Sequence, residues 1–340
     1  MDVYRTIAEE FESFGIPDLH GTSVIWVKEA EDGVDVFGAS NEMAGSTVLF
    51  HARDGKLVCS LPPVAVGASS LAVLRSQTGA TKVLGVSPSL ALVLDLTGDT
   101  CSSANFEWLS ELKPEHVLSS NNRFVVWGTG GVIMACFGAP EHSTEHRNFP
   151  PCQTVALANR PKAAGKDVPV FLRIEGGKLL TCLGVMLAEG FSALTEQLVV
   201  HVLKDNSLLV FALSPRDRRC PLRHVHVLQN PLSSVPTPVP LPYKCECLFA
   251  RMALDLDAAP PRLLVADSNG LTGFAIEESG EIGAGEILWF DEGHPNAAFG
   301  QKAAVAVGKH HVAVPLEGGT VVVLLKAKLY GARFLQNNIV

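Results

Sequence analysis

The chain has little charge and no excess of positive charge. Only 18% of its 340 residues are charged, and 35 Asp and Glu outnumber 27 Lys and Arg, which gives a net charge of −8. Nucleic acids and anionic lipid surfaces are bound through basic patches, so we expect no direct nucleic-acid binding. Because 47% of the residues are hydrophobic, the chain has enough apolar surface for a large folded core.

Signals for secretion or membrane insertion are also missing. The first 19 positions contain scattered acidic residues, whereas a secretory signal needs a basic start and an apolar run, and no stretch approaches the ~18 apolar residues of a membrane span. We therefore expect no membrane insertion and a cytoplasmic protein, with the nucleus as the alternative location. No two of the eight cysteines are spaced as CxxC, and we interpret them as reduced core residues.

Seven stretches of the chain share one pattern, in which two apolar runs flank a short polar or glycine-containing turn. One is RLLVADSNGLTGFAI (262–276), and the others are 34–61, 82–99, 123–138, 168–184, 197–213 and 310–326. The pattern predicts β-hairpins, because Gly, Asn and Asp tolerate the positive φ of tight hairpin turns. The turns are on average about 46 residues apart. The interval before the turn near residue 205, in the stretch 197–213, is short, and the interval after it is long. We therefore expect one hairpin to be displaced within its unit.

This period predicts the fold class. Repeats of ~40–50 residues, each with room for four strands, are typical of β-propeller blades. We predict an all-β fold, a seven-bladed β-propeller of four-stranded blades with a short N-terminal helix. Six or eight blades, or two β-sandwich domains, are the alternatives.

Over residues 22–340 the repeats resemble a degenerate WD40-type β-propeller. The resemblance lies in the period and the hairpins. None of the four tryptophans, at positions 26, 108, 127 and 289, is followed by Asp, and Gly-His pairs do not recur with the period. The resemblance implies a ring of blades without implying any particular chemistry.

Two segments lie outside the repeat pattern. Apolar residues at positions 3, 7, 11 and 14 have helical spacing and predict a helix over 2–14, within an N-terminal helical extension of residues 1–21. The propeller then spans 22–340, with a Pro-rich insertion at 230–242 that predicts an extended loop. We expect residues 332–340 or 22–28 to supply the strand that joins the first and last blades.

Motifs for metal binding are weak. His142, Glu145 and His146 have the H-x-x-E-H spacing of a zinc-peptidase class, but this spacing needs a helix, and the proline-flanked stretch predicts an inter-strand loop. Cys245 and Cys247 have one intervening residue, whereas zinc knuckles and redox dithiols have two. We expect no metal site and no cofactor.

The remaining polar motifs also favour structural roles. Asp255 and Asp257 share one face of a predicted strand, and we interpret them as a solvated strand edge. The glycine-rich stretch 128–131 and the two EGG sequences predict hairpin turns. His201 and Asp267 are polar exceptions on strands that are otherwise apolar. We therefore predict that the protein is not an enzyme.

One basic cluster and the Pro-rich insertion form the candidate partner surface. Arginine forks match carboxylates, and polyproline segments lose little conformational entropy on docking. The predicted partner-binding residues are Arg216, Arg218, Arg219, Arg223, Pro236, Pro238 and Pro240. The predicted function is that of an interaction scaffold whose partners are other proteins of a multisubunit intracellular complex. The alternative is an enzyme or small-ligand-binding propeller that uses a central channel.

Overall fold

The computed structural model describes most strands of the chain and the turns of its C-terminal half. The described residues are 12–15, 20–30, 33–41, 47–53, 56–60, 70–75, 81–87, 90–95, 103–105, 112–120, 123–137, 143–150, 152, 154–160, 168–228, 234–244, 250–267, 270–289, 305–315 and 320–331. Every statement below concerns these residues.

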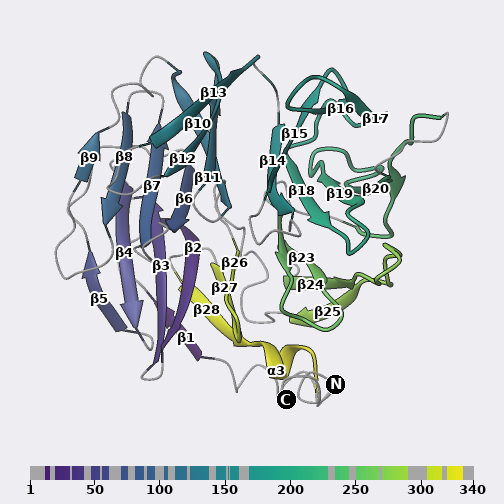
Figure 1. Ribbon diagram of the computed structural model, residues 1–340. Helices are drawn as coiled ribbons and strands as arrows, with labels where there is room; N and C mark the ends of the chain where they lie inside the picture. Colours follow the sequence, from purple (N-terminus) through teal and green to yellow (C-terminus); the bar gives the residue numbers. More distant parts are fainter. Residues whose placement is uncertain are drawn as a thin grey trace. The chain divides into compact units, whose positions relative to one another are not determined.

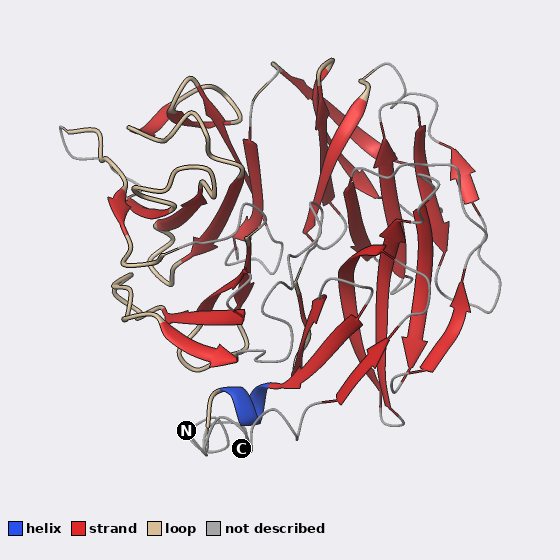
Figure 2. Ribbon diagram, turned by 180° about the vertical axis from the view of Figure 1, so that it is seen from behind, coloured by secondary structure: helices blue, strands red, loops and turns tan. Residues whose placement is uncertain are grey.

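The chain divides into two compact units. The first comprises residues 1–65, 218–221 and 242–340, and the second comprises 66–217 and 222–241. Each unit is built from antiparallel sheets of four strands, and in all but one of the described sheets the strands are neighbours in sequence order (Figure 1). Figure 2 shows strands as the prevailing element, with one short helix, α3 (Lys326–Leu329), among the described residues.

The first unit contains three of these sheets. One consists of β2 (His20–Ala30), β3 (Gly33–Asn41), β4 (Thr47–Arg53) and β5 (Lys56–Ser60). The next consists of β22 (Arg251–Asp255), β23 (Arg262–Asp267), β24 (Gly270–Ala275) and β25 (Glu286–Trp289). The third has the order β1 (Glu12–Gly15), β28 (Thr320–Leu325), β27 (His311–Pro315) and β26 (Ala306–Val307).

The second unit contains four sheets. The first two are β6 (Ser70–Arg75), β7 (Thr81–Ser87), β8 (Leu90–Asp95) and β9 (Ser103–Asn105), and β10 (Pro114–Ser120), β11 (Arg123–Gly128), β12 (Gly131–Phe137) and β13 (Ser143–Phe149). The other two are β14 (Thr154–Arg160), β15 (Val168–Glu175), β16 (Lys178–Thr181) and β17 (Met186–Glu189), and β18 (Gln197–Val202), β19 (Leu208–Leu213), β20 (Leu222–Val227) and β21 (Val239–Pro240).

The N-terminal segment does not form the predicted helix where it is described. Residues 12–15, inside the predicted helix 2–14, form strand β1, and residues 1–11 lie outside the described residues. β1 pairs antiparallel with β28, from Glu12 opposite Val323 to Gly15 opposite Thr320. The valine-rich strand β28 offers a sheet edge, and pairing with that edge overrides the helical spacing of the apolar residues.

This pairing also corrects the predicted closing strand. Residues 22–28 belong to β2, which pairs with β3, and residues 332–340 lie outside the described residues. The segment that completes the β26–β28 sheet is Glu12–Gly15, which the helical interpretation had removed from the sheets.

The predicted hairpins are confirmed, with one displaced as expected. Six of the seven repeated stretches supply the middle two strands of a four-stranded sheet, as β23 and β24 do for 262–276. The stretch 197–213 instead forms β18 and β19, the first two strands of its sheet. The Pro-rich segment then contributes the fourth strand, β21, which explains the long interval that follows.

The prediction of an all-β β-propeller is confirmed, but the predicted seven-bladed ring and N-terminal helix need correction. The described four-stranded sheets are divided between two compact units, three in the first and four in the second, and residues 12–15 form the strand β1. The structure therefore does not show the predicted single ring of seven blades with an N-terminal helix. The even spacing of hairpins predicted the blade unit but not how the units are distributed.

Apolar side chains fill the space between neighbouring sheets within each unit. In the second unit, Leu172, Ile174 and Leu179 of one sheet pack with Val200 and Val210 of the next. In the first unit, Leu264 and Leu271 pack with Val312 and Leu324. Strands buried on both faces explain why the repeats are runs of Val and Leu rather than alternating patterns. Among the described residues, no helix is long and apolar enough to cross a membrane.

Candidate partner-binding surfaces

Arg223 connects the predicted basic loop with the Pro-rich segment. It lies on β20, opposite Pro240 of the short edge strand β21. Its guanidinium donates to the Asp217 carboxylate at 3.1 Å and to the Gly190 carbonyl at 3.3 Å. Arg223 therefore holds the loop, the turn after β17 and the proline strand together, and its charge is already paired within the chain.

The Pro-rich segment is fastened to two neighbouring sheets. The amide of Glu189 donates to the Pro236 carbonyl at 3.2 Å, and the amide of Leu241 donates to the Leu222 carbonyl at 2.9 Å. Gly190 faces Thr237 and Pro238. A Cβ placed on this glycine would lie less than 4 Å from both side chains. Residues 234–240 are thus an extended strap on the second unit. The predicted insertion 230–242 is described only from residue 234 onward.

Apolar side chains on and near this strap are exposed. Val235 and Val239 have relative exposures of 41% and 54%, and Leu228 at the end of β20 has 43%. We call Leu228 and residues 234–240 the proline edge. Prolines at an edge strand prevent ladder formation with other chains at those positions, but they leave the valines available for contact.

The other predicted arginines differ in their pairing. Arg216 forms an ion pair with Glu196 at 3.0 Å, and 64% of its side chain is exposed. Arg218 and Arg219 are exposed and are grouped with the first unit, whereas Arg216 and the proline edge belong to the second. The structure thus brings Arg223 and the prolines together, and it leaves Arg216 exposed in the same unit.

A cavity in the second unit was not predicted from the sequence. Its volume is about 470 Å³, and it lies where β10 and β11 face the turn between β15 and β16. The lining residues are Glu115, His116, Trp127, Gly128, Thr129, Cys152, Glu175 and Gly176. Because these residues come from three separate parts of the chain, no local sequence motif predicts the cavity.

Aromatic stacking and an unpaired donor characterise this cavity. The rings of His116 and Trp127 stack with centroids 5.0 Å apart and planes 29° apart. Trp127 is only 9% exposed, and its indole Nε1 is buried with no hydrogen-bond acceptor among the described residues. Burial raises the pKa of the Cys152 thiol to about 11, so this residue is neutral at physiological pH.

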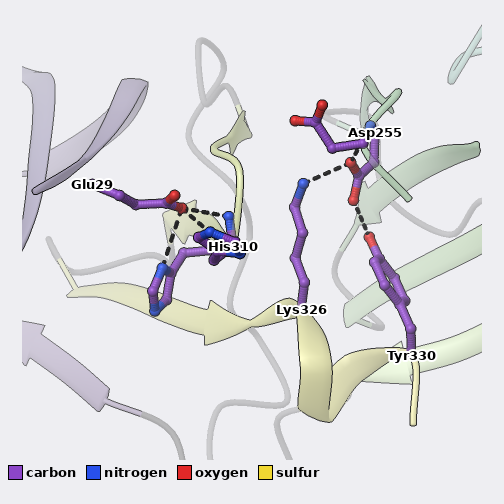
Figure 3. A network of polar contacts seen from close by, with 7 residues as sticks. Glu29, Asp255, His310, Lys326 and Tyr330 are labelled. Carbon is purple, nitrogen blue, oxygen red and sulfur yellow. Dashed lines mark hydrogen bonds and ion pairs between the residues drawn. The ribbon is translucent and has the colours of Figure 1, made fainter. Parts of the chain in front are cut away.

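Asp255 is the largest departure from the sequence interpretation, because it lies in the core rather than on a solvated edge. Its carboxylate accepts from Lys326 Nζ at 2.6 Å and from the Tyr330 hydroxyl at 2.6 Å, and the Asp255 and Lys326 side chains are completely buried. Figure 3 shows both donors pointing toward Asp255. Burial and the Asp255 carboxylate raise the pKa of Tyr330, so its hydroxyl remains a donor. Asp257 is exposed, and only its amide contacts Asp255.

Glu29 makes a second polar junction in the first unit. One carboxylate oxygen accepts from the amides of His310 and His311 at 2.6 and 2.9 Å, and it lies 3.2 Å from His311 Nδ1 (Figure 3). The carboxylate thereby fixes the turn that leads into β27 against β2. Both junctions connect strands, and their described partners are protein groups, so we assign them to stability.

The residues of the weak metal and thiol motifs are only partly described in the structure. Glu145 and His146 lie on strand β13 rather than in the expected loop, and His142 is outside the described residues. Adjacent residues of a strand point to opposite faces, so the helical spacing of the zinc motif is not realised. Cys245 and Cys247 are outside the described residues. Across the described part of the chain, no three His, Cys, Asp or Glu side chains are grouped to hold a metal ion.

A serine and a histidine lie in contact, but their hydrogen bonds differ from those of a catalytic pair. His226 Nε2 is 2.7 Å from Ser207 Oγ, which donates its proton to Asp205 Oδ1 at 2.5 Å. The histidine must then donate to the serine instead of accepting its proton. The Ser207 hydrogen bonds lower the pKa of Asp205, and the group closes the hairpin turn at Asn206.

The other glycine-rich and polar residues noted in the sequence have structural roles. Thr129 and Gly130 form the turn between β11 and β12, and Gly176 and Gly177 form the turn between β15 and β16. Asp267 is buried and accepts from the Tyr243 hydroxyl at 2.7 Å. His201 is partly buried, and desolvation lowers its pKa. Among the described cysteines, Cys136, Cys152, Cys182 and Cys220 form no disulfide bond.

Comparisons with known proteins establish the fold and leave the family open. No family profile and no curated protein matches the chain. Among solved structures, it is similar to YCF48 bound to a D1 peptide, with a TM-score of 0.54, 11% identity, and coverage of 93% of this chain and 95% of that one. It is also similar to a virginiamycin B lyase from Staphylococcus aureus, with a TM-score of 0.54, 11% identity, and coverage of 93% and 99%.

A third similar structure is YCF48 from Cyanidioschyzon merolae, with a TM-score of 0.52, 10% identity, and coverage of 93% and 98%. At these identities the similarity shows the fold alone. The chain is a β-propeller by structure, and its resemblance to WD40 proteins is one of fold. A peptide-bound protein and a lyase among the similar structures show that the fold serves both binding and catalysis.

Proposed function

We propose that the protein is a non-enzymatic interaction platform that binds other proteins of an intracellular complex, with the proline edge as a contact surface. The observation that carries this proposal is the exposure of Val235 and Val239 on a segment that hydrogen bonds hold in extended form. A surface that is already ordered loses little conformational entropy on binding. The peptide-bound structure with a similar fold is consistent with such a role.

Arg216 extends this surface electrostatically. Its side chain is 64% exposed, so its ion pair with Glu196 is open to solvent and can exchange for a partner carboxylate at small cost. Arg218 and Arg219 offer further exposed charge in the first unit. We therefore propose that the partner presents an apolar segment flanked by acidic residues. Arg223 has the separate task of holding the strap in place.

Affinity purification from native cells tests the proposal with a charge-reversal variant. The triple substitution Arg216→Glu, Arg218→Glu and Arg219→Glu keeps Arg223 and its structural contacts. A matched control reverses the exposed charges of Lys178, Lys204 and Lys309, which changes the net charge equally. The arginine variant should keep its circular dichroism spectrum and lose at least one partner at physiological salt.

A second pair of variants tests the apolar contact. Val235→Ser with Val239→Ser should weaken recovery of the same partner, because both valines are exposed and their loss leaves the core intact. Recovery of the same partners in equal amounts by the parent, both test variants and the lysine control would reject the proline edge as the contact surface. We also propose a cytoplasmic location, which fluorescence imaging of the tagged full chain can test.

A further inference from the structure

The cavity in the second unit is a separate site from the proline edge, and its lining residues have a different chemistry. Its volume of about 470 Å³ lies within the ~300–1,000 Å³ typical of pockets that enclose small molecules. It is large enough for one long side chain with its neighbouring backbone.

Negative charge dominates the lining of the cavity. Glu115 and Glu175 are the two carboxylates among its described lining residues, which include no Lys or Arg. Glu175 is partly neutralised, because Arg173 Nη2 lies 3.5 Å from its carboxylate. Glu115 has no ion-pair partner among the described residues. The protonated Cys152 thiol adds no charge, so the cavity favours a cationic group.

The aromatic pair favours a planar cation with an apolar stem. His116 is exposed and stacks on the buried Trp127 at 5.0 Å, which makes an aromatic wall beside Glu115. A guanidinium can stack on such rings and form two parallel hydrogen bonds with a carboxylate. An ammonium or a metal ion uses only part of this arrangement, so arginine fits better than lysine or an inorganic cation.

Trp127 supplies the observation that points to a polypeptide. Its buried Nε1–H group has no acceptor among the described residues, and leaving a buried donor unpaired is unfavourable. A simple guanidinium compound has no acceptor to offer this donor. A peptide carbonyl next to an arginine side chain can accept from Nε1 while the guanidinium contacts the carboxylates.

We propose that this cavity binds an arginine side chain of a partner polypeptide. The guanidinium contacts Glu115 and, more weakly, Glu175, its stem lies against the rings of His116 and Trp127, and a neighbouring carbonyl accepts from Trp127 Nε1. This site is independent of the proline edge, so either proposal can fail without the other.

Synthetic peptides test the proposal with the full chain. The probe is a fluorescent pool of seven-residue peptides with arginine at the centre and randomised flanks, and the matched pool has citrulline, which keeps the shape and removes the charge. Fluorescence anisotropy should show at least tenfold tighter binding of the arginine pool, and binding should weaken with salt. Equal binding of the two pools, or no binding of either, would overturn the proposal.

Variants distinguish the roles of the lining residues. Glu115→Gln should weaken binding tenfold or more, and Glu175→Gln should weaken it less, because Arg173 already neutralises part of its charge. The control Glu189→Gln changes an exposed glutamate of the same unit and should have no effect. Trp127→Phe removes the donor and keeps an aromatic ring, and it should weaken binding of the peptide more than binding of n-butylguanidinium, which has no carbonyl. An unchanged affinity in Glu115→Gln would reject the site.

A measurement on the unaltered chain guards against misfolded variants. Cys152 lines the same cavity, so the arginine pool should slow its alkylation at least threefold, whereas the citrulline pool should not. If n-butylguanidinium, which has the charge and the stem but no carbonyl, binds as tightly as the peptide pool, the predicted carbonyl contact to Trp127 is wrong and the polypeptide assignment fails with it.

Discussion

The Lys326 ammonium group lies 2.6 Å from the Asp255 carboxylate, and both side chains are fully buried. The pair joins the start of α3, directly after β28, to the end of β22, two parts of the first unit that lie far apart in the sequence. Asp255 also accepts from the partly buried Tyr330, and the buried Lys326 ammonium has no access to water as a substitute partner.

Asp255→Asn should therefore be strongly destabilising. The substitution leaves the Lys326 charge buried without a counter-ion, and breaking a buried pair in this way costs about 3–5 kcal/mol. Urea unfolding of the full chain measures the loss. The control is Glu286→Gln, which breaks the Arg262 ion pair at a carboxylate that is 64% exposed and should cost at most about 1 kcal/mol. Equal effects of the two substitutions would contradict the structural role of Asp255.

Acidification should destabilise the fold through two partly buried histidines. Desolvation lowers the pKa of His201 and His224 from their ordinary value of 6.5. As the pH falls below 6.5, the unfolded chain binds protons that the folded chain does not, so the free energy of unfolding falls. Above this pH both states are neutral at these residues and contribute no slope.

The measurement compares urea unfolding at pH 7.5 and pH 5.5. The parent should lose stability at the lower pH, and the double substitution His201→Gln with His224→Gln should lose less. Asp205 titrates in a more acidic range and does not affect this comparison. A double variant with the same loss as the parent would show that other groups determine the acid sensitivity.

Cys152 should be slow to react with iodoacetamide. Its pKa of about 11, against an ordinary value of 9.0, reduces the reactive thiolate at pH 8 by roughly 100-fold. Mass spectrometry of the peptide that contains Cys152 gives the alkylation rate in the folded chain. The same peptide in urea-unfolded chain is the control and should react at the rate of an ordinary thiol. Similar rates in both states would contradict the burial of this thiol.

Gly128→Ala should disturb the turn that borders the cavity. A Cβ at this position would lie 2.1 Å from the Lys113 carbonyl oxygen, so the backbone must move, at a cost of about 1–3 kcal/mol or more. Gly176→Ala is the matched control, because its Cβ meets nothing within 4 Å and only its positive φ of 56° opposes the substitution. Thermal melting should show the larger loss for Gly128→Ala. The reverse order would mean that Lys113 moves away without cost.

The hairpins were predictable because each is specified within a short stretch of sequence. Runs of Val and Leu on both sides of Thr129 and Gly130, for example, define β11 and β12 without reference to the rest of the chain. The displaced hairpin at 197–213 was also visible, since its interval differed from the others. The N-terminal segment was mispredicted because its partner, β28, lies some three hundred residues away. The local spacing of apolar residues could not show that the edge of β28 is available for pairing.

The sites were less predictable for the same physical reason. Asp255 resembles a solvated residue until Lys326, 71 positions later, is placed against it. The cavity combines Glu115, Trp127 and Glu175 from different strands and turns, and no spacing rule connects them. The arginines of the basic loop were visible as charges. Their division between internal pairing at Arg223 and exposure at Arg216 depends on the position of Asp217 and Glu196 in space.

The pairing of β1 with β28 also affects the order in which the chain can fold during its synthesis. β1 is synthesised before every other described strand, yet its neighbour in the sheet begins only at residue 320. β1 must therefore remain without this partner while the intervening residues are synthesised. The β26–β28 sheet can gain β1 only after residue 325 has left the ribosome.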